Sequence, residues 1–514
     1  MRLKLNESLL TLYLTFMSFS SIYLYVTRNK TRLLLIVLGL LVVFYVLSTF
    51  LCNITNRLTL KPVSNVSKRG LWLIFAAAFL IVFAVFIIAF SAAFPGSFEN
   101  DSIAQMRQAV TGIYDDWHPI WHTLVYFTLP YRAFGTPSAV VVLQITYLSL
   151  AIAYMTLIIL KHAGVTWSLI SFTYLVFNPF TLFLVVAPLK DVGFATASLI
   201  SMSIGVDIYF SGNSRKTPMI KCVILGFMLA NAAIFRHNGI LFSAFVLIAL
   251  FFIREKRKWL VVVIAFAASM VIIQVSAYRL TDATHIDTAV IQVTGLPLSI
   301  IGNVAKDTPE LLDEETKEFV YGIAPAEVWQ ERYSRGNFNL IKYGGIHDPD
   351  VIEEAGTLNI VKMALRSATA SPQAALEAFF ALTDFVYGFD VQDKADIDVI
   401  CFSISDNDLG ISYEGNERIA GLLNVYYRVL KLHGWNFIRK LGFTVFMPIL
   451  VIAASCRLNS LKDWRRILWS FPLLAYDFGT MLLLSGHDAR FFYVSFLIWP
   501  LTIIALLNKH NEGA

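Results

Sequence analysis

The segment from Phe94 to His122 holds the densest group of residues suited to chemistry. Its Asp101 is followed by Ser102 at the predicted start of a short helix over residues 102–110. A carboxylate held at a membrane surface can take a proton from an attacking hydroxyl, which makes Asp101 a candidate catalytic base. Aspartate is equally favoured as a helix cap, so a purely structural role for Asp101 is the alternative.

The tripeptide Asp116-Trp117-His118 adds a carboxylate, an aromatic face and an imidazole to the same segment, and we predict that all three bind substrate. The aromatic ring suits a sugar, although Trp117 is equally suited to anchoring in the headgroup region. His118 can instead hydrogen-bond nearby backbone. Asp101, Asp116 and His118 are metal-ligand types without diagnostic spacing, so a divalent metal remains an alternative cofactor.

Three short polar groups between later apolar runs each contain a fixed cation. Such cations suit a lipid phosphate or pyrophosphate, and arginine can bind two phosphate oxygens at once. Each cation can instead neutralise a neighbouring carboxylate or extend to lipid headgroups. The predicted substrate-binding residues of these groups are Lys190 and Asp191; Arg236, His237 and Asn238; and Asp488 and Arg490.

The composition predicts that membrane-spanning helices position all of these residues. Of 514 residues, 57% are hydrophobic and 15% charged, and the mean hydropathy is +0.64, which is too apolar for a soluble core. A run of about 20 apolar residues crosses a hydrocarbon core of roughly 30 Å. About twelve candidate spans follow: residues 9–26, 33–52, 71–93, 138–160, 167–186, 192–210, 219–235, 240–253, 259–278, 437–455, 467–484 and 491–507.

Other features narrow the class of protein. The first apolar run lacks a small-residue cleavage site, so we expect it to remain as a span. Residues 120–129 are too few to span and are expected to be interfacial or re-entrant. The net charge of +5 is dispersed, which argues against nucleic-acid binding, and the four cysteines show no disulfide pattern. No nucleotide-binding glycine loop, serine-hydrolase elbow or zinc-protease motif occurs.

Lysine and arginine in the short loops predict the orientation, because they favour the cytoplasmic side. With the spans as drawn, four basic groups fall on one side, whereas Arg28, Lys30 and Arg32 fall on the other, so one of the first two spans is misplaced or interfacial. The four groups are Arg57, Lys61, Lys68 and Arg69; Arg215, Lys216 and Lys221; Arg254, Lys256, Arg257 and Lys258; and Arg457, Lys462, Arg465 and Arg466.

The same orientation places every candidate site residue outside the cytoplasm, where the polar segments suggest one shared cavity. We predict an all-α fold in three parts. Residues 1–278 form a transmembrane module whose first outer loop, residues 94–122, is catalytic. Residues 279–436 form a mostly helical extracytoplasmic domain, and residues 437–514 form the last transmembrane helices.

At these residues the chain resembles the GT-C superfamily of membrane glycosyltransferases, and more closely a bacterial branch with Asp-Ser followed by Asp-Trp-His-Pro. The first loop carries the resemblance. Later landmarks of the branch match Lys190 with Asp191, Arg236 with Asn238 and Gly239, and Arg490. The first-loop residues are Pro95, Gly96, Asp101, Ser102, Gly112, Asp116, Trp117, His118 and Pro119.

The resemblance implies a GT-C-like fold and inverting transfer of a sugar from a polyprenyl-phosphate donor to a glycan, lipid or protein acceptor of the cell envelope. It makes Asp101 the base, and it makes Lys190, Arg236 and Arg490 the groups that stabilise the departing phosphate. Some members carry a paired acidic motif for a metal. Here Glu99 stands two residues before Asp101, which leaves metal dependence open.

Two other classes of function compete with this interpretation. A transporter or flippase of a lipid-linked glycan would need polar residues along the whole crossing and repeat symmetry, and the sequence shows neither. A non-catalytic assembly protein with an outer recognition domain would have the same composition. We expect a multi-pass protein of the bacterial cytoplasmic membrane, in contact with membrane lipids, whose active site is extracytoplasmic.

Overall fold

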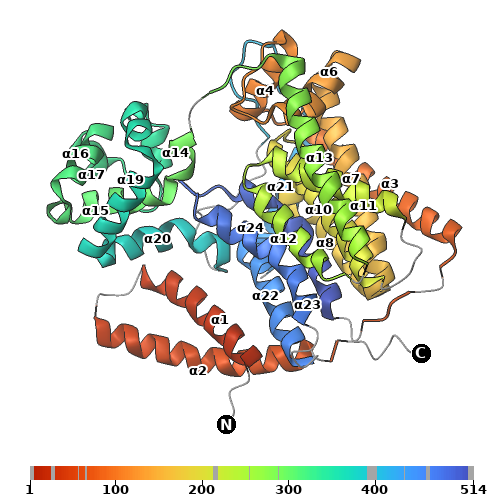
Figure 1. Cartoon of the computed structure of the whole chain (residues 1–514), viewed down its shortest axis with the longest axis horizontal. Coiled ribbons are helices and arrows are strands. Elements are labelled where there is room, and N and C mark those ends of the chain that lie inside the picture. The colour runs from red at the N-terminus through yellow and green to blue at the C-terminus, as the bar shows by residue number, and fades with distance from the viewer. Residues whose placement is uncertain are drawn as a thin grey trace.

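The regular structure of this chain is helical (Figure 1). The computed structural model describes residues 5–24, 29–55, 57–58, 60–63, 66–211, 218–253, 255–286, 289–345, 347–389, 402–432, 435–458 and 464–506. Across these ranges strand pairing is limited to isolated bridges, such as the one between Phe98 and Ile404. The predicted all-α class is confirmed.

All twelve predicted spans coincide with helical residues, and six described helices are long and apolar enough to cross a membrane. Four shorter apolar helices accompany them. The chain is thus a membrane protein with transmembrane helices; the predicted span ends Val26 and Leu507 lie outside the described residues. The unbroken helices are α1 (Leu5–Tyr23), α2 (Lys30–Thr55), α3 (Lys68–Ala92), α7 (Ser138–Ala163), α10 (Lys190–Phe210), α11 (Met219–Phe235), α12 (Gly239–Phe251) and α13 (Lys256–Thr281).

The remaining spans are divided into shorter helices. Asn178 precedes Pro179 and is therefore kept out of the helical region, so one span becomes two helices, the second of them capped by the Asn178 side chain. The pieces are α8 (Val165–Phe177) with α9 (Pro179–Leu184); η3 (Trp435–Arg439) with α22 (Leu441–Leu458); α23 (Trp464–Ile467) with η5 (Leu468–Ser470) and α24 (Phe471–Met481); and η6 (Ala489–Phe492) with α25 (Tyr493–Thr502) and η7 (Ile503–Leu506).

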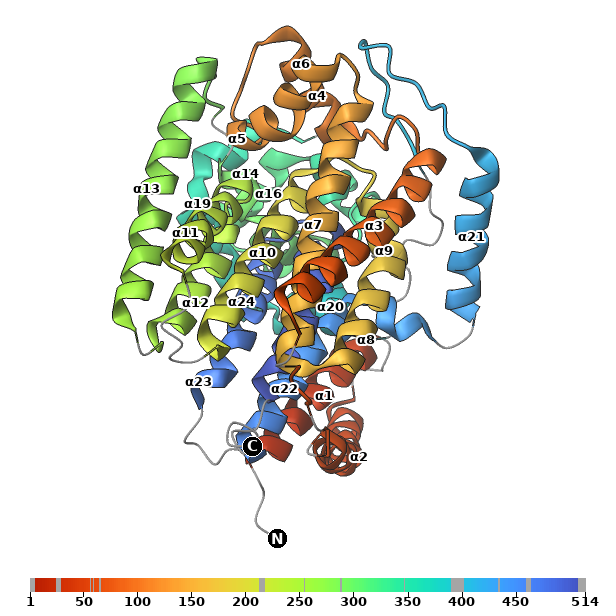
Figure 2. The same ribbon diagram turned by 90° about the vertical axis from the view of Figure 1, so that its right-hand side faces the viewer.

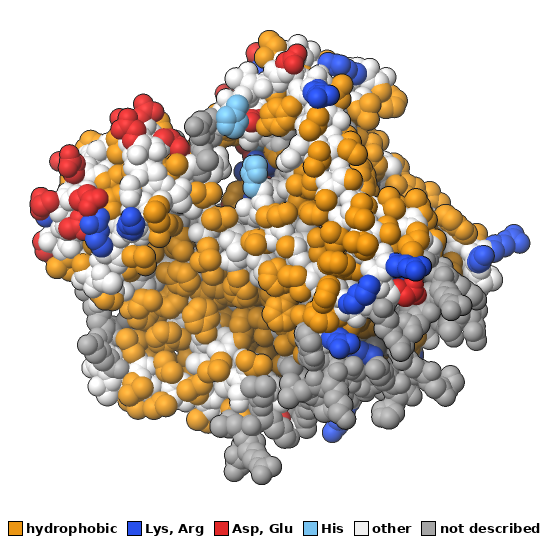
Figure 3. Space-filling model, in the orientation of Figure 1, with side chains coloured by type: hydrophobic (Ala, Val, Ile, Leu, Met, Phe, Trp, Pro, Cys, Tyr) orange, Lys and Arg blue, Asp and Glu red, His pale blue; other side chains and the backbone are white. Residues whose placement is uncertain are grey.

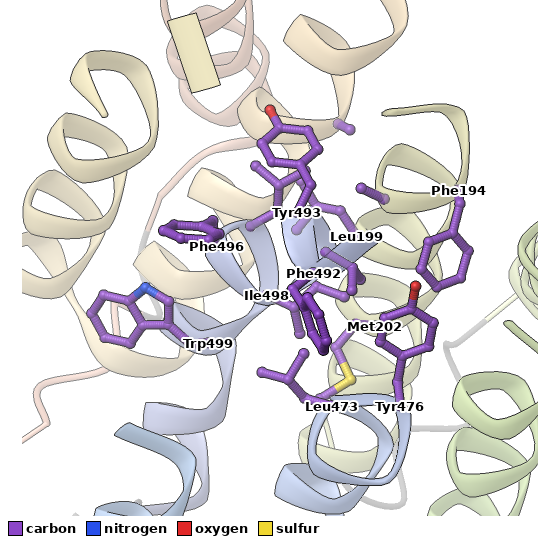
Figure 4. Close-up of a cluster of buried hydrophobic side chains, with 14 of the residues drawn as sticks. Phe194, Leu199, Met202, Leu473, Tyr476, Phe492, Tyr493, Phe496, Ile498 and Trp499 are labelled. Atoms are coloured by element: carbon purple, nitrogen blue, oxygen red, sulfur yellow. The ribbon is translucent and has the colours of Figure 1, made fainter. Parts of the chain in front are cut away.

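Helix α10 forms the centre of the bundle, with 89% of an 18-residue stretch of it buried. Aromatic and aliphatic side chains from α10, α24 and the last helices pack together there (Figure 4). Lys190 begins α10 and Arg490 lies one turn before α25, so this packing sets the relative positions of the two cations. The labelled residues of the cluster are Phe194, Leu199, Met202, Leu473, Tyr476, Phe492, Tyr493, Phe496, Ile498 and Trp499.

The segment after α3 folds into short helices that cover one end of the bundle, here named the α4 end (Figure 2). They are α4 (Asn100–Thr111), α5 (Ile120–His122), η1 (Thr123–Thr128) and α6 (Leu129–Phe134). Glu99 occupies the N-cap position, so Asp101 lies inside the first turn. The expectation that Asp101 caps a helix starting at Ser102 is therefore wrong, because that helix starts two residues earlier.

The described basic residues of the later predicted groups gather at the opposite end of the bundle, the basic end. Asp207, near the end of α10, forms ion pairs with Lys161 at 2.6 Å and Lys221 at 2.8 Å. Arg465 and Arg466 lie over Phe252 and Phe210 at the same end. Arg28, Arg215, Lys216, Arg254 and Lys462 lie outside the described residues.

The first two helices do not run parallel to the rest of the bundle. Helix α2 runs across the molecule in Figure 1 and is seen almost end-on in Figure 2, whereas α13 is upright in both views. This crossing bears on the predicted conflict around Lys30 and Arg32, because an oblique α2 need not place its ends on opposite sides of a membrane.

A separate hydrophobic cluster, spanning Ile291 to Ala374 and centred on Trp329, lies to one side of the bundle. We call residues 289–374 the lobe. The later helix α20 (Pro372–Tyr387) joins the bundle core through Leu382 to Tyr387, and α21 (Glu417–Leu432) packs on α3. The lobe contains α14 (Ala289–Val293), α15 (Gly295–Asp307), η2 (Pro309–Leu311), α16 (Glu314–Ile323), α17 (Ala326–Glu331), α18 (Asn339–Lys342) and α19 (Pro349–Ala370).

The contact between α11 and α13 allows a stability test. A Cβ atom on Gly226 would lie 2.6 Å from the Ala265 Cβ and 2.7 Å from the Phe266 nitrogen, so Gly226→Leu must push the helices apart. We expect a destabilisation of roughly 1–3 kcal/mol, seen as a lower melting temperature of the detergent-purified protein. Gly39→Leu is the matched control, since nothing lies within 4 Å of its Cβ position. Equal melting temperatures for the two variants would contradict the packing.

Candidate active site

Arg490 brings together three carboxylates at the α4 end. Its guanidinium lies 2.7 Å from Asp488, 3.2 Å from Asp101 and 3.2 Å from Glu99. The Arg490 side chain is 22% exposed and that of Asp101 31%, so the cluster is sheltered but open to a ligand. The sequence predicted Asp101, Asp488 and Arg490 as site residues, and the structure joins all three.

The carboxyl groups of Asp101 and Glu99 differ in protonation behaviour. Burial raises the pKa of Asp101, but the positive charges of Arg490 and Lys190, and of His118 once it is protonated at low pH, outweigh it, so this pKa lies below its ordinary value. Burial raises the pKa of Glu99 and is only partly offset by Arg490. Asp101 is consequently the carboxylate that stays ionised at the lower pH.

Local backbone contacts fix the segment that carries Asp101. The Ser97 nitrogen donates to the Val186 carbonyl at 2.9 Å, and the Ser102 hydroxyl donates to the Pro188 carbonyl at 2.9 Å. Gly96 has φ +138°, and a Cβ atom there would lie 2.5 Å from the Val141 side chain, so only glycine fits. These contacts attach the first loop to the connection that leads into α10.

His118 and Lys190 form a second pair beside Asp101. The Lys190 Nζ lies 3.4 Å from the His118 Nδ1, which can accept from the ammonium when the imidazole proton is on Nε2. Burial and the neighbouring Lys190 lower the pKa of His118 to about 4, so the ring is neutral near pH 7. Among the residues that the structure describes, Lys190 has no carboxylate within ion-pair distance, unlike the other two predicted cations.

Arg236 and Asp191 form a buried ion pair behind Lys190. The Arg236 side chain is 10% exposed and that of Asp191 2%, and the guanidinium also lies 4.3 Å from the centre of the Phe491 ring. Burial, Lys190 and Arg236 together lower the pKa of the adjacent His237. Asn238 donates to the Thr480 hydroxyl at 3.4 Å. The charge of Arg236 is thus already matched.

Asp116 binds a different part of the chain from Asp101. Its carboxylate accepts from the Ile286 nitrogen at 2.8 Å and the Tyr278 hydroxyl at 2.9 Å, and His285 lies at 2.6 Å. Burial raises the pKa of Asp116, but these hydrogen bonds outweigh it and lower the pKa. Asp116 therefore attaches the first loop to the end of α13, and the neighbouring Trp117 is 40% exposed.

The metal set considered from the sequence, Asp101, Asp116 and His118, does not fit a metal site. Asp116 is hydrogen-bonded to the α13 end, whereas Asp101 is paired with a guanidinium that repels a cation. Within the described ranges no three His, Cys, Asp or Glu side chains are arranged to hold a metal ion.

A buried polar group beneath the site was not found from the sequence. The Gln105 carbonyl oxygen lies 2.8 Å from the His122 Nδ1 and accepts from the Thr123 hydroxyl at 3.2 Å. The His122 ring stacks on Tyr126 with centroids 4.7 Å apart. Gln105 lies four residues after Asp101 and so shares its helix face, which was the available signal. These contacts hold α4 against α5 and η1, and so help to fix the helix that carries Asp101.

The buried pair of Arg236 and Asp191 generates a stability prediction. Arg236→Gln leaves an uncompensated buried carboxylate, and we expect the variant to lose about 3–5 kcal/mol of stability. The double variant Arg236→Met, Asp191→Leu removes both charges and should recover most of that loss. Thermal unfolding in detergent measures both, and a single variant as stable as wild type would show that the pair does not support the fold.

Comparison with known proteins identifies the family without assigning an activity. A family model described as a family of unknown function, DUF6020, matches residues 6–483. No curated protein matches the chain. A crystal structure of ArnT from Cupriavidus metallidurans bound to undecaprenyl phosphate is similar over 85% of this chain and 78% of that chain, with 12% identity and a TM-score of 0.32, a level that carries no weight for activity. Since the family model covers most of the chain, the protein belongs to the DUF6020 family.

Proposed function

We propose that this protein is an inverting membrane glycosyltransferase that moves a sugar from a polyprenyl-phosphate donor to an acceptor hydroxyl. The observation that supports it most is the pairing of an ionised, partly exposed Asp101 with a nearby cation, Lys190, that no described carboxylate neutralises. Such a site offers a base for the acceptor and a charge for the departing phosphate.

The proposed reaction is a single displacement. The acceptor hydroxyl gives its proton to Asp101 while its oxygen forms a bond to the anomeric carbon. The bond between that carbon and the phosphate oxygen breaks, and the lipid phosphate leaves with the electron pair. Attack from the face opposite the phosphate inverts the anomeric centre.

The other site residues then have distinct tasks. Lys190 stabilises the negative charge of the leaving phosphate. The neutral His118 donates a hydrogen bond from its Nε2 to an oxygen of the same phosphate. Arg236 forms an ion pair with Asp191, the residue that follows Lys190, and so helps to hold Lys190 in position. Arg490 is already paired with three carboxylates, so we assign it to positioning Asp101.

The proposed location is the extracytoplasmic face of the cytoplasmic membrane of a bacterium. The support is the distribution of charge, because the described lysines and arginines of the later basic groups lie at the basic end, the end expected to face the cytoplasm. The site lies at the α4 end, where an envelope glycan, lipid or protein acceptor would reach it.

Replacement of Asp101 tests the role of the base. In proteoliposomes with labelled polyprenyl-phosphate sugars and envelope-glycan acceptors, Asp101→Asn should bind donor but transfer sugar at least ~100-fold more slowly. Asp408→Asn is the control, since Asp408 forms an ion pair with Arg107 of α4 and is 70% exposed. Full activity of Asp101→Asn would move the base to Glu99 or Asp116. Glycan crossing the bilayer without any transfer by wild type would favour a transporter.

The pKa values of Asp101 and His118 predict a flat acid side of the pH profile between pH 5 and 7. The folded-state pKa of Asp101 is lowered and that of His118 is about 4, so both groups keep their working charge from pH 5 to 8. On the acid side, activity should fall as the pH drops toward 4, when His118 becomes a cation beside Lys190, and should fall further at still lower pH, where Asp101 gains a proton. The test is kcat/KM measured against pH on protein whose fold is monitored in parallel, and an acidic limb near 6.5 would contradict the assignment of His118.

A further inference from the structure

The lobe reaches the proposed site through helix α18. The Asn339 nitrogen donates to the Ser485 carbonyl at 3.0 Å, and the Ser485 hydroxyl donates to the Asn339 side chain at 2.7 Å. A Cβ atom on Gly486 would lie 2.4 Å from the Asn339 amide nitrogen, so glycine permits this close approach. Ser485 stands three residues before Asp488, which fixes the lobe beside the carboxylate cluster.

Tyr343 follows α18 directly, and its side chain is exposed to water although other protein groups lie close to its phenol. It is 73% exposed, but burial by surrounding protein and the nearby Asp101 raise the pKa of its phenol. Arg490 and Asp488 also act on the Tyr343 phenol, so its ring lies near the carboxylate cluster of the proposed site. Figure 3 shows a hollow between the lobe and the α4 end, with histidine, basic and acidic side chains near its mouth.

Lys342, the last residue of α18, precedes Tyr343 and has no carboxylate partner among the described residues. Burial alone lowers the pKa of Lys342, and none of the described carboxylates lies within ion-pair distance of it. Its Nζ lies 5.3 Å from the centre of the Tyr343 ring. The lobe therefore presents an unmatched cation over an exposed aromatic ring, and that ring lies close enough to Asp101 to feel its charge.

We propose that Lys342 and Tyr343 form a subsite for an acceptor sugar that carries a negative charge. The open ring packs on the apolar face of a sugar, and the ammonium binds the carboxylate or phosphate of the same residue. The inference rests on the proposed function, because it assigns the lobe side of Asp101 to the acceptor. Lys190, on the bundle side, remains for the donor phosphate.

Another surface cavity of the lobe is a weaker candidate for this role. It is lined by Glu315, Asn359, Lys362, Leu365 and Arg366. Its arginine is already paired with Glu315 at 2.8 Å and with Asp313 at 3.4 Å. It also lacks an aromatic ring, so it supplies a control rather than a subsite.

Direct binding to the full-length protein in lipid nanodiscs tests the subsite. The probes are a fluorescent oligogalacturonide, a phosphorylated mannose disaccharide and neutral maltotriose. We expect wild type to bind at least one anionic probe about 10-fold more tightly than maltotriose, with Lys342→Gln abolishing that preference. Tyr343→Ala should weaken binding about 10-fold, Tyr343→Phe should bind as wild type, and Lys362→Gln should change nothing.

Several outcomes would overturn the subsite. They are equal affinity for neutral and anionic probes, no saccharide binding by wild type, and binding unchanged in both Lys342→Gln and Tyr343→Ala. Binding of the polyprenyl-phosphate donor and transfer that depends on Asp101, measured on the same preparations, report separately on the proposed function. The two anionic probes distinguish a carboxylate from a phosphate as the charged group.

Discussion

A guanidinium at the boundary of a membrane bundle must be matched by negative charge, and in this chain that requirement organises the α4 end. Arg490 is only 22% exposed, and leaving it without carboxylates would be costly. Glu99 and Asp101 come from the first loop and Asp488 from the last, so the charge of Arg490 joins segments 391 positions apart in sequence. The lobe docks on the same last loop through Ser485, and so its position also depends on this cluster.

The transmembrane core determines where the remaining cations lie. Helix α10 is buried along its length, so Lys190 at its first residue cannot move without disturbing the packing shown in Figure 4. Asp191, one residue later, then fixes Arg236 on the next connection. Core packing and charge matching thus place one unmatched cation beside one ionised carboxylate. That juxtaposition supports the proposed chemistry more directly than any single residue does.

The sequence predicted what depends on local composition. Apolar runs indicated the spans, and the polar groups between them gave Asp101, His118, Lys190 and Arg490 as candidate site residues. It did not predict partners, because an ion pair between Asp101 and Arg490 depends on how distant helices pack. Asp116 illustrates the limit, since its carboxylate hydrogen-bonds to the Ile286 nitrogen and the Tyr278 hydroxyl. The start of α4 was misplaced for a local reason, because Asp101 is favoured both as a cap and in the first turn.

The ion pair that shelters Asp101 also limits its strength as a base, because a carboxylate with a lowered pKa holds a proton weakly. A donor phosphate at Lys190 would bring negative charge close to Asp101 and offset the cations that lower its pKa. The pKa of Asp101 would then rise toward its ordinary value, and the carboxylate would become a better proton acceptor. In the proposed reaction, Asp101 therefore becomes a stronger base once the donor is bound. Deprotonation of the acceptor hydroxyl is then favoured in the donor-bound site over the donor-free site.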